Sequence, residues 1–388
     1  MFYDNNKKAF DGNDPFYIVA QARSGAVPVA SGLPGSAKTE SVGAFTKELS
    51  RKTNIDWDFH PLNLSTQMPE DAGGTPTFGE VKIEGVTHRC IVPLLQEAHV
   101  KAIHSPTVVF LDEINQCSPQ VMAANQELWF NNPPENSIVL GAMNPAEIAT
   151  DGFEFPPAVV NRLCLLDWEF DHDGWLEGMS KGEFPAPSFP IVQGDWSGFA
   201  TKWCGLVAQF SKEKPQHFNW SEVFPKGDEM HKPWRSPRSW HRAATCLGAA
   251  ESVGASRHTA MKILSGFVGM GPATEFFGWT DTLGYPSSEE LFFNPGRLRL
   301  PPSFDVSVSL VSGVQSFCKM QMEKTNGDAQ SDHWERGLDF CESAFMENRE
   351  VGSAITGRFV KLKPADYMPK RRSHPLWDAI NNSRASAC

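Results

Sequence analysis

The first ~170 residues alternate short apolar runs with polar segments whose spacing suits amphipathic helices. The run Thr107–Glu113 is continuous and rich in β-forming residues, as expected for a strand that is covered on both faces. Ser137–Pro145 and Leu163–Phe170 are further apolar runs, Ala26–Ser31 is a short buried strand, and another strand is expected at Trp57–Leu64. Strands separated by helical stretches predict a parallel sheet with helices on both sides. Residues 1–171 are therefore expected to form an α/β core.

Pro28 is the feature that fits this prediction least well. It stands inside the first apolar run, and a proline cannot donate a hydrogen bond to a neighbouring strand. The sequence therefore argues against a central position for that strand, where each N–H should bond to a neighbouring strand.

An inserted segment interrupts the expected core at about residues 68–92. Its first part is rich in turn residues, and its second part alternates around Gly85 like a small hairpin. A short helix is expected to follow over residues 93–103. Two interpretations of the insertion remain open: a contact surface for a partner or a pore, or a structural hairpin that covers the sheet.

The rest of the chain has mainly helical character. Helices are expected from Thr39 to Leu49, from Gly198 to Phe210, and from Pro237, where Ser236 supplies an N-cap signature. The tryptophans and phenylalanines between Trp168 and Trp240 are interpreted as core. We expect a helical lid with its linker over residues 172–320. Residues 321–388 form a C-terminal extension of unknown role, with a basic cluster at residues 370–372.

Composition narrows the class of protein. The 388 residues suffice for about two to three domains. A net charge of −11 argues against a surface that mainly grips nucleic acid, although a local basic patch is compatible with that average. No stretch approaches the length of an apolar membrane span, and the eight cysteines form no C-x-x-C pair. We expect reduced thiols, a cytoplasmic protein and no structural metal site.

The segment "SGLPGSAKTES" follows the first expected strand and precedes a helix, which is the context of a phosphate-binding loop. Lys38 would reach the β- and γ-phosphates of a nucleotide, and the Thr39 hydroxyl would ligate Mg²⁺. Ala37 replaces the last glycine of the usual pattern. The residues expected to contact ATP are Gly32, Leu33, Pro34, Gly35, Ser36, Ala37, Lys38, Thr39 and Glu40.

Polar residues at the ends of two later strands complete this chemistry. Asp112 can hold Mg²⁺, and Glu113 can polarise a water for attack on phosphorus. Asn144 can orient that water. Each pattern also has a plainer interpretation, as solvated acids at a strand end and as a turn residue before proline. Arg162 and Arg238 could likewise be surface ion-pair partners.

In this order the motifs resemble the AAA+ ATPases, and among them the MoxR branch. Gly32–Thr39 matches Walker A, Val108–Glu113 matches Walker B, and Asn144 matches sensor 1. Arg162 matches the arginine finger and Arg238 matches sensor 2. The segments "HPLNLSTQMPEDAGGTP", "LDEINQCSPQVMAANQEL", "FPPAVVNRL" and "SPRSW" also look like MoxR-type proteins, over about three quarters of the chain.

The resemblance implies an Mg²⁺-dependent ATPase that forms a ring, expected to be a hexamer. Arg162 would complete a neighbour's site in trans, Arg238 would act in cis, and Ala37 would be tolerated. Relatives work as remodelling or maturation chaperones beside a partner with a von Willebrand factor A-type domain, which we do not expect in this chain. The alternatives are a nucleotide-gated ring scaffold with little hydrolysis, to which Ala37 points, and a nucleic-acid translocase, which needs a basic pore lining.

Overall fold

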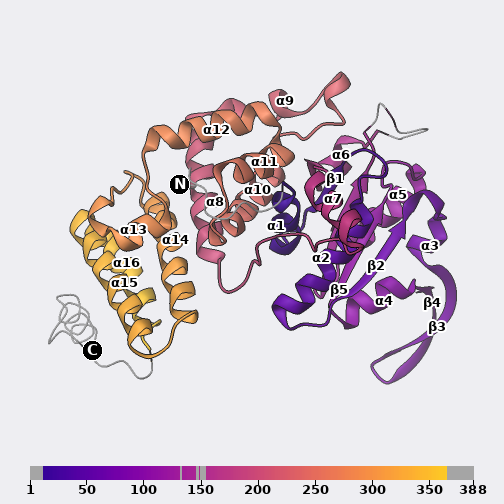
Figure 1. Ribbon diagram of the computed structural model, residues 1–388, viewed down its shortest axis with the longest axis horizontal. Helices are drawn as coiled ribbons and strands as arrows, with labels where there is room; N and C mark the ends of the chain where they lie inside the picture. The colour runs from indigo at the N-terminus through magenta and orange to yellow at the C-terminus, as the bar shows by residue number, and fades with distance from the viewer. Residues whose placement is uncertain (1–11, 132, 146–147, 149–153, 365–388) are drawn as a thin grey trace.

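The computed structural model describes residues 12–131, 133–145, 148 and 154–364. The molecule is elongated, with an α/β unit at one end, a group of helices in the middle and a helical bundle at the other end (Figure 1). None of the helices in these ranges has the length and apolar character that a membrane span requires. The basic cluster at residues 370–372 lies outside the described residues.

The α/β unit is built on a five-stranded parallel sheet with the strand order β2-β5-β6-β1-β7. The strands are β1 (Val27–Ser31), β2 (Asp58–Asn63), β5 (Thr107–Asp112), β6 (Ser137–Met143) and β7 (Leu163–Asp167). All five expected strands are therefore present, and the α/β fold class with a helical region behind it is confirmed. The last strand ends at Asp167 instead of Phe170, because Trp168 turns back toward the loop after β1.

Helices cover both faces of the sheet, which explains why β1, β5 and β6 are largely apolar and buried, whereas the edge strand β2 is more polar and more exposed. On β5, Val108 and Phe110 pack toward α1 (Asp14–Ala22) and α2 (Lys38–Thr53). Val109 and Leu111 point the opposite way. They pack toward α4 (Glu97–His104) and α5 (Pro119–Asn125). Sequence analysis did not anticipate α1, which is buried between the sheet and the lid helices.

Pro28 is tolerated in a central strand because of where its missing N–H falls. The Val27 N–H donates to the Arg162 carbonyl on the β7 side, 3.1 Å away. Since successive N–H groups alternate in direction, Pro28 faces β6. Pairing between β1 and β6 starts only at Val29, opposite Gly141. The proline therefore leaves no gap in the hydrogen-bond ladder.

The insertion forms a hairpin of β3 (Thr75–Ile83) and β4 (Val86–Leu94), preceded by η1 (Leu64–Thr66) and α3 (Pro69–Gly73). Glu84 and Gly85 make its turn with φ of 51° and 83°, as a two-residue hairpin turn requires. The hairpin extends away from the sheet (Figure 1), and Phe78 is 88% exposed. It does not cover the sheet, so that interpretation was wrong. The following helix begins at Glu97, not at residue 93, because β4 continues through Leu94.

The remaining elements are helical. They are α6 (Pro157–Val160), α7 (His172–Lys181), α8 (Ser197–Glu213), α9 (Trp220–Val223), α10 (Pro237–Ser252), α11 (Arg257–Val268), α12 (Met270–Leu283), α13 (Ser288–Phe293), α14 (Phe304–Glu323), α15 (Gly327–Glu347) and α16 (Arg349–Val360). Single turns or short irregular helices lie at η2 (Gln126–Asn131), η3 (Pro215–His217), η4 (Gly227–Glu229) and η5 (Pro295–Arg297). The predicted N-cap of α10 is present, since Ser236 accepts a hydrogen bond from the Ser239 N–H.

Two hydrophobic clusters divide this helical region. Side chains of α8 and α10–α12 belong to the same cluster as α1 and one face of the sheet. Trp334, Phe340 and Phe359 belong to a separate cluster built from α13–α16. Helix α14 runs through the expected boundary at residue 320. We infer that the C-terminal unit begins near α13, not at residue 321.

Asp305, Ser307 and Ser309 have the D-x-S-x-S spacing of a von Willebrand factor A-type metal site. They lie on helix α14, where the Ser307 hydroxyl donates to the Pro301 carbonyl and the Ser309 hydroxyl to the Asp305 carbonyl. The spacing therefore belongs to an ordinary helix start in this chain.

His217 is a buried histidine whose protonation state follows from its neighbours. Its Nδ1 lies 3.3 Å from an Arg235 guanidinium nitrogen, and its Nε2 lies 2.8 Å from the Glu275 carboxylate. Because arginine can only donate, Nδ1 accepts and the ring proton sits on Nε2, where it donates to Glu275. Burial lowers the pKa of His217 below its usual range, against the opposing effect of Glu275.

The stability of the protein is therefore expected to fall as the pH drops from about 7.5 to 5.5. In that window the unfolded chain gains a proton at residue 217 that the folded chain resists, so acid favours unfolding. His217→Gln should show a smaller loss of melting temperature over the same range, measured by circular dichroism. Equal losses in both proteins would show that His217 does not contribute. The lowered pKa values of His99 and His333 act in the same direction and are present in both proteins.

Candidate functional site

The loop between β1 and α2 has the conformation of a phosphate cradle. Gly35 and Ala37 both have left-handed backbone angles, with φ of 76° and 59°. Helix α2 begins directly after them at Lys38, and no side chain caps its first turn. The free N–H groups of that turn point out of the helix and favour a negative charge.

Ala37 adopts the backbone conformation that the missing glycine would have adopted. Its φ of 59° and ψ of 28° lie in the left-handed region, which costs a residue with a Cβ about 1–2 kcal/mol. The loop thus keeps its shape in spite of the substitution, and the cost is carried as local strain.

Ala37→Gly is accordingly expected to raise the free energy of unfolding by about 0.5–1 kcal/mol, since the relieved strain exceeds the extra entropy of an unfolded glycine. Urea denaturation would measure it. Ala44→Gly, in the interior of the same helix, should instead lower the free energy of unfolding by about 1 kcal/mol. A destabilised Ala37→Gly protein would contradict the strain.

Lys38 is buried at the base of the loop, with 8% of its surface exposed. Its ammonium group donates to the carbonyls of Gly32 and Leu33, at 2.8 and 3.0 Å, and lies 3.4 Å from the Asn144 side-chain oxygen. Burial lowers the pKa of Lys38, while Asp112 and Glu113 act to raise it. The positive charge is therefore held ready inside the loop, where a phosphate would stabilise it.

Thr39 and Asp112 face each other across the loop. The Thr39 hydroxyl donates to an Asp112 carboxylate oxygen at 2.7 Å, and the other oxygen accepts from the Glu113 N–H at 3.0 Å. Hydroxyl and carboxylate oxygens are the hard ligands that Mg²⁺ takes beside nucleotide phosphates. This donor pair fits the metal that the loop chemistry implies.

Glu113 occupies a strained position immediately after β5. Its φ is 53°, which is uncommon for a residue other than glycine and is frequent at functional sites. The Ser65 hydroxyl lies 2.7 Å from the Glu113 carboxylate and equally close to the Asn63 side-chain oxygen. Ser65 and Asn63 were not predicted. The only feature of the sequence that could have indicated them is that polar residues stand at the end of β2, the strand that pairs with β5.

Asn144 follows β6, and a hydrogen bond to its backbone holds it in place. Its backbone carbonyl accepts from the Asn115 side-chain amide at 2.9 Å. Asn115 is itself 5% exposed, and its side-chain oxygen has no partner among the described residues. Asn115 is thus a further supporting residue that the sequence did not reveal.

The sheet order explains why these groups meet. Strands β5, β6 and β1 are neighbours, and the carboxyl ends of parallel strands lie at one edge of the sheet. Asp112, Asn144 and the loop that carries Lys38 therefore converge there. This edge, with Lys38, Thr39, Asp112, Glu113 and Asn144, is the candidate site.

A groove with aromatic walls adjoins the phosphate loop. Gly35, Ser36, Ala37 and Glu40 form one side, and Trp168, Phe170, Trp175 and Phe184 line the other. The Trp168 indole N–H donates to the Ser36 carbonyl at 3.0 Å.

The prediction that all these aromatic residues belong to the core was wrong for part of the segment. Phe170, Trp175 and Phe184 are 45%, 40% and 58% exposed. Trp175 lies on α7, and Phe170 and Phe184 lie just before and after that helix, so all three line the groove. Trp203 and Trp240 are buried, as expected.

The two predicted arginines lie elsewhere. Arg162 immediately precedes β7, at the amino edge of the sheet, where its guanidinium donates to the Asn131 side chain at 2.6 Å and to the Ala158 carbonyl at 2.5 Å. Burial, and next the positive charge of Arg238, lower the pKa of Arg162, against Glu127. Arg238 therefore lies beside Arg162 and not beside Lys38. The expectation of a role in cis conflicts with this placement, which follows from the packing of α10 against the Asn161 turn.

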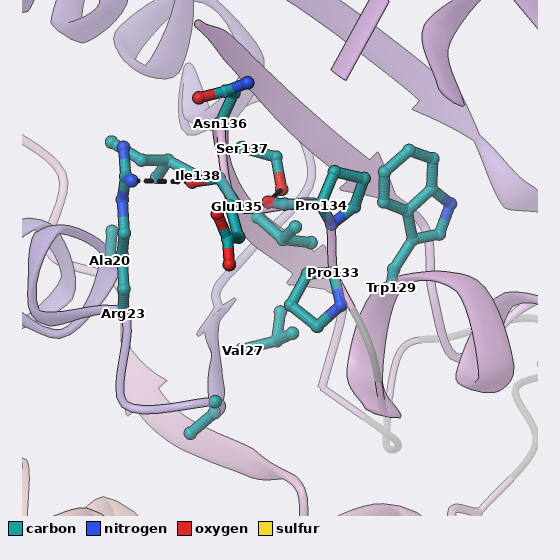
Figure 2. A pocket seen from close by; sticks show the side chains of 13 residues that line it. Ala20, Arg23, Val27, Trp129, Pro133, Pro134, Glu135, Asn136, Ser137 and Ile138 are labelled. Atoms are coloured by element: carbon teal, nitrogen blue, oxygen red, sulfur yellow. Dashed lines mark hydrogen bonds between the residues drawn. The ribbon is translucent and has the colours of Figure 1, made fainter. Parts of the chain in front are cut away.

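Another pocket opens at the same amino edge, between α1 and the start of β6. Figure 2 shows Arg23, Trp129, Pro133 and Pro134 around it, with the Arg23 guanidinium bonded to the Glu135 carbonyl at 2.8 Å. The pocket contains none of the predicted site residues, and its arginine is already engaged by the backbone. It is therefore not the candidate site.

No protein-family model and no curated protein matches the chain. Thirty-two solved chains show detectable similarity. One of them is PCH-2 from C. elegans, with 12% identity over 74% of this chain and 71% of that chain, and a TM-score of 0.26. A TM-score this low does not establish a common fold, so an activity for this chain has to follow from its own residues.

Proposed function

We propose that this protein binds ATP with Mg²⁺ at the carboxyl edge of its sheet and hydrolyses the γ-phosphate, as a ring-forming AAA+ ATPase of the MoxR type. The observation that carries the proposal is the convergence of a buried lysine, a hydroxyl–carboxylate pair, a strained glutamate and an asparagine around one glycine-rich loop. Each group has a separate task in phosphoryl transfer.

Lys38 and the loop amides would bind the phosphates. The lysine now donates to two backbone carbonyls, so a phosphate would replace neutral acceptors with charged ones and strengthen these bonds. Thr39 and Asp112 would hold Mg²⁺, which supplies charge neutralisation at the β- and γ-phosphates when bound.

Glu113 would accept the proton of the attacking water, and Asn144 would orient that water. The strained backbone aims the Glu113 carboxylate, and the Ser65 hydroxyl holds it in place. Since the Ser65 bond uses one carboxylate oxygen, the other remains able to accept a proton. The nucleotide base would stack in the aromatic groove, against side chains such as Phe170 and Trp175.

Completion of the site would require a second copy of the chain. Arg162 and Arg238 lie together at the amino edge, away from the phosphate loop of their own subunit. We propose that both act in trans on a neighbour's γ-phosphate, in a closed ring expected to be hexameric. A heterologous contact of this kind closes into a ring when its rotation allows.

The work done by hydrolysis is proposed to be the remodelling of a protein partner in the cytoplasm. The exposed hairpin β3–β4, with Phe78 and Ile91 at 88% and 73% exposure, offers apolar side chains for such a partner. A von Willebrand factor A-type partner rests on the resemblance alone. Lys82 and Arg89 are balanced along the hairpin by Glu80 and Glu84, which does not favour nucleic acid.

Mg²⁺-dependent release of phosphate from ATP by the purified protein tests the proposal. Turnover that requires Mg²⁺ supports an ATPase. ATP binding that drives assembly without turnover would instead support the gated scaffold, and turnover stimulated by DNA in a salt-sensitive manner would support the translocase. Absence of ATP binding would overturn the proposed site.

A further inference from the structure

Asn161 joins the turn that carries Arg162 to helix α10. Its side-chain oxygen accepts hydrogen bonds from the hydroxyls of Ser236 and Ser239, the second at 2.9 Å. Its backbone carbonyl accepts from the Arg242 guanidinium at 3.4 Å. Two elements far apart in the sequence therefore meet at a single residue.

The contact is buried and belongs to one face of α10. Ser236 and Ser239 are 1% and 2% exposed. The two serines and Arg242 recur every three residues, so they lie along the same side of the helix. Loss of the Asn161 oxygen would leave the Ser239 hydroxyl buried with only the Ser236 hydroxyl, 3.1 Å away, as a side-chain partner.

The contact also holds like charges together. Burial lowers the pKa of Arg242 to about 10, and the positive charges of Arg238 and Arg162 lower it further; burial and then Arg238 also lower the pKa of Arg162. Within the described ranges none of the three forms an ion pair with a carboxylate. Glu127 offsets part of the positive charge on Arg162. The hydrogen bonds of Asn161 add a direct link between the Arg162 turn, on the sheet, and the start of the helix that carries Arg238.

We propose that Asn161 is a positioning residue that clamps α10 to the Arg162 turn, so that Arg162 and Arg238 move as one unit with the lid. This inference rests on the proposed function, in which both arginines serve a neighbour's nucleotide. Movement of α10 then changes the place of both arginines at once, and the state of one subunit's lid reaches the next subunit's site.

Asn161→Ala and Ser239→Ala test the clamp. A misplaced Arg162 is expected to lower kcat for ATP by about 10²-fold in Asn161→Ala and by about tenfold in Ser239→Ala, with KM unchanged because the phosphate loop is intact. Ser252→Ala is the matched control, since the Ser252 hydroxyl only donates to Ala249 within the same helix. It should turn over ATP like wild type.

A second comparison separates positioning from a structural role. In a background that lacks both arginines, Arg162→Ala with Arg238→Ala, Ser239→Ala should cause no further loss of the residual turnover, measured with enzyme in excess over radiolabelled ATP. A further loss there, or a raised KM, would overturn the clamp. Ser239→Ala keeps the Ser236–Asn161 bond, so it decides the question even if Asn161→Ala fails to fold.

The two proposals fail differently. If Arg162→Ala is inactive while Asn161→Ala and Ser239→Ala match wild type, the clamp is wrong and the ATPase proposal stands. If Arg162→Ala turns over ATP normally, the role of Arg162 is wrong and the clamp falls with it.

Discussion

Glu113→Gln is expected to bind ATP like wild type and to hydrolyse it about 10²–10⁴-fold more slowly. Glutamine has the shape of glutamate and can still accept the Ser65 hydroxyl bond, so the strained turn after β5 should persist. It cannot accept a proton from water. Turnover in excess Mg·ATP, together with binding of a fluorescent ATP analogue, measures the two effects separately.

Glu84→Gln is the matched control for this variant. It is the same substitution at another residue with a left-handed backbone, since Glu84 has a φ of 51° and lies at the exposed tip of the hairpin. It should hydrolyse ATP at the wild-type rate. Undiminished turnover in Glu113→Gln would remove Glu113 from the mechanism, and lost binding would show that the side chain has a structural task instead.

Arg162→Ala is expected to bind ATP and to lose hydrolysis by about 10³–10⁵-fold. The phosphate loop and Mg²⁺ ligands lie at the opposite edge of the sheet and should be unaffected. What disappears is the positive charge that a neighbour would receive at its γ-phosphate. Arg51→Ala, which removes an exposed arginine paired with Glu48 on α2, is the control and should remain active.

Mixing the two inactive variants tests action in trans. A Glu113→Gln subunit still carries Arg162, and an Arg162→Ala subunit still carries Glu113. If the arginine serves a neighbour, a mixed ring contains some complete sites and recovers part of the turnover. If it served its own subunit, no mixture would recover activity. Size-exclusion chromatography with ATP should show that both variants still assemble.

The strands and the residues that follow them could be predicted because the signal is local. Every strand of the parallel sheet except β2 is a short, mainly apolar run, and the carboxyl ends of parallel strands meet at one edge whatever the loops do. Lys38, Asp112 and Asn144 were found this way. Residues such as Ser65 and Asn115 could not be, because their roles depend on contacts 48 and 29 positions along the chain.

The position of Arg238 could not be predicted from the sequence either, because it also depends on contacts between residues far apart in the chain. Ser236 and Pro237 correctly predict where α10 begins, but they do not say which edge of the sheet that end approaches. The Asn161 side chain decides this by accepting bonds from two serines of the helix. The aromatic groove was also not predictable, since Trp175 on α7 is exposed along the groove whereas Trp203 on α8 is buried in the core, and both stand in similar aromatic sequence.

The exposed hairpin β3–β4 also affects how readily the protein self-associates. It presents apolar side chains beside the outer edges of β3 and β4, which pair with no other strand in the described part of the chain, and open strand edges pair readily with extended polypeptides. A chain made in excess of whatever covers this hairpin is expected to self-associate. The amount of the partner that covers the hairpin, more than the rate of synthesis, would then determine how much of the protein remains free of aggregates.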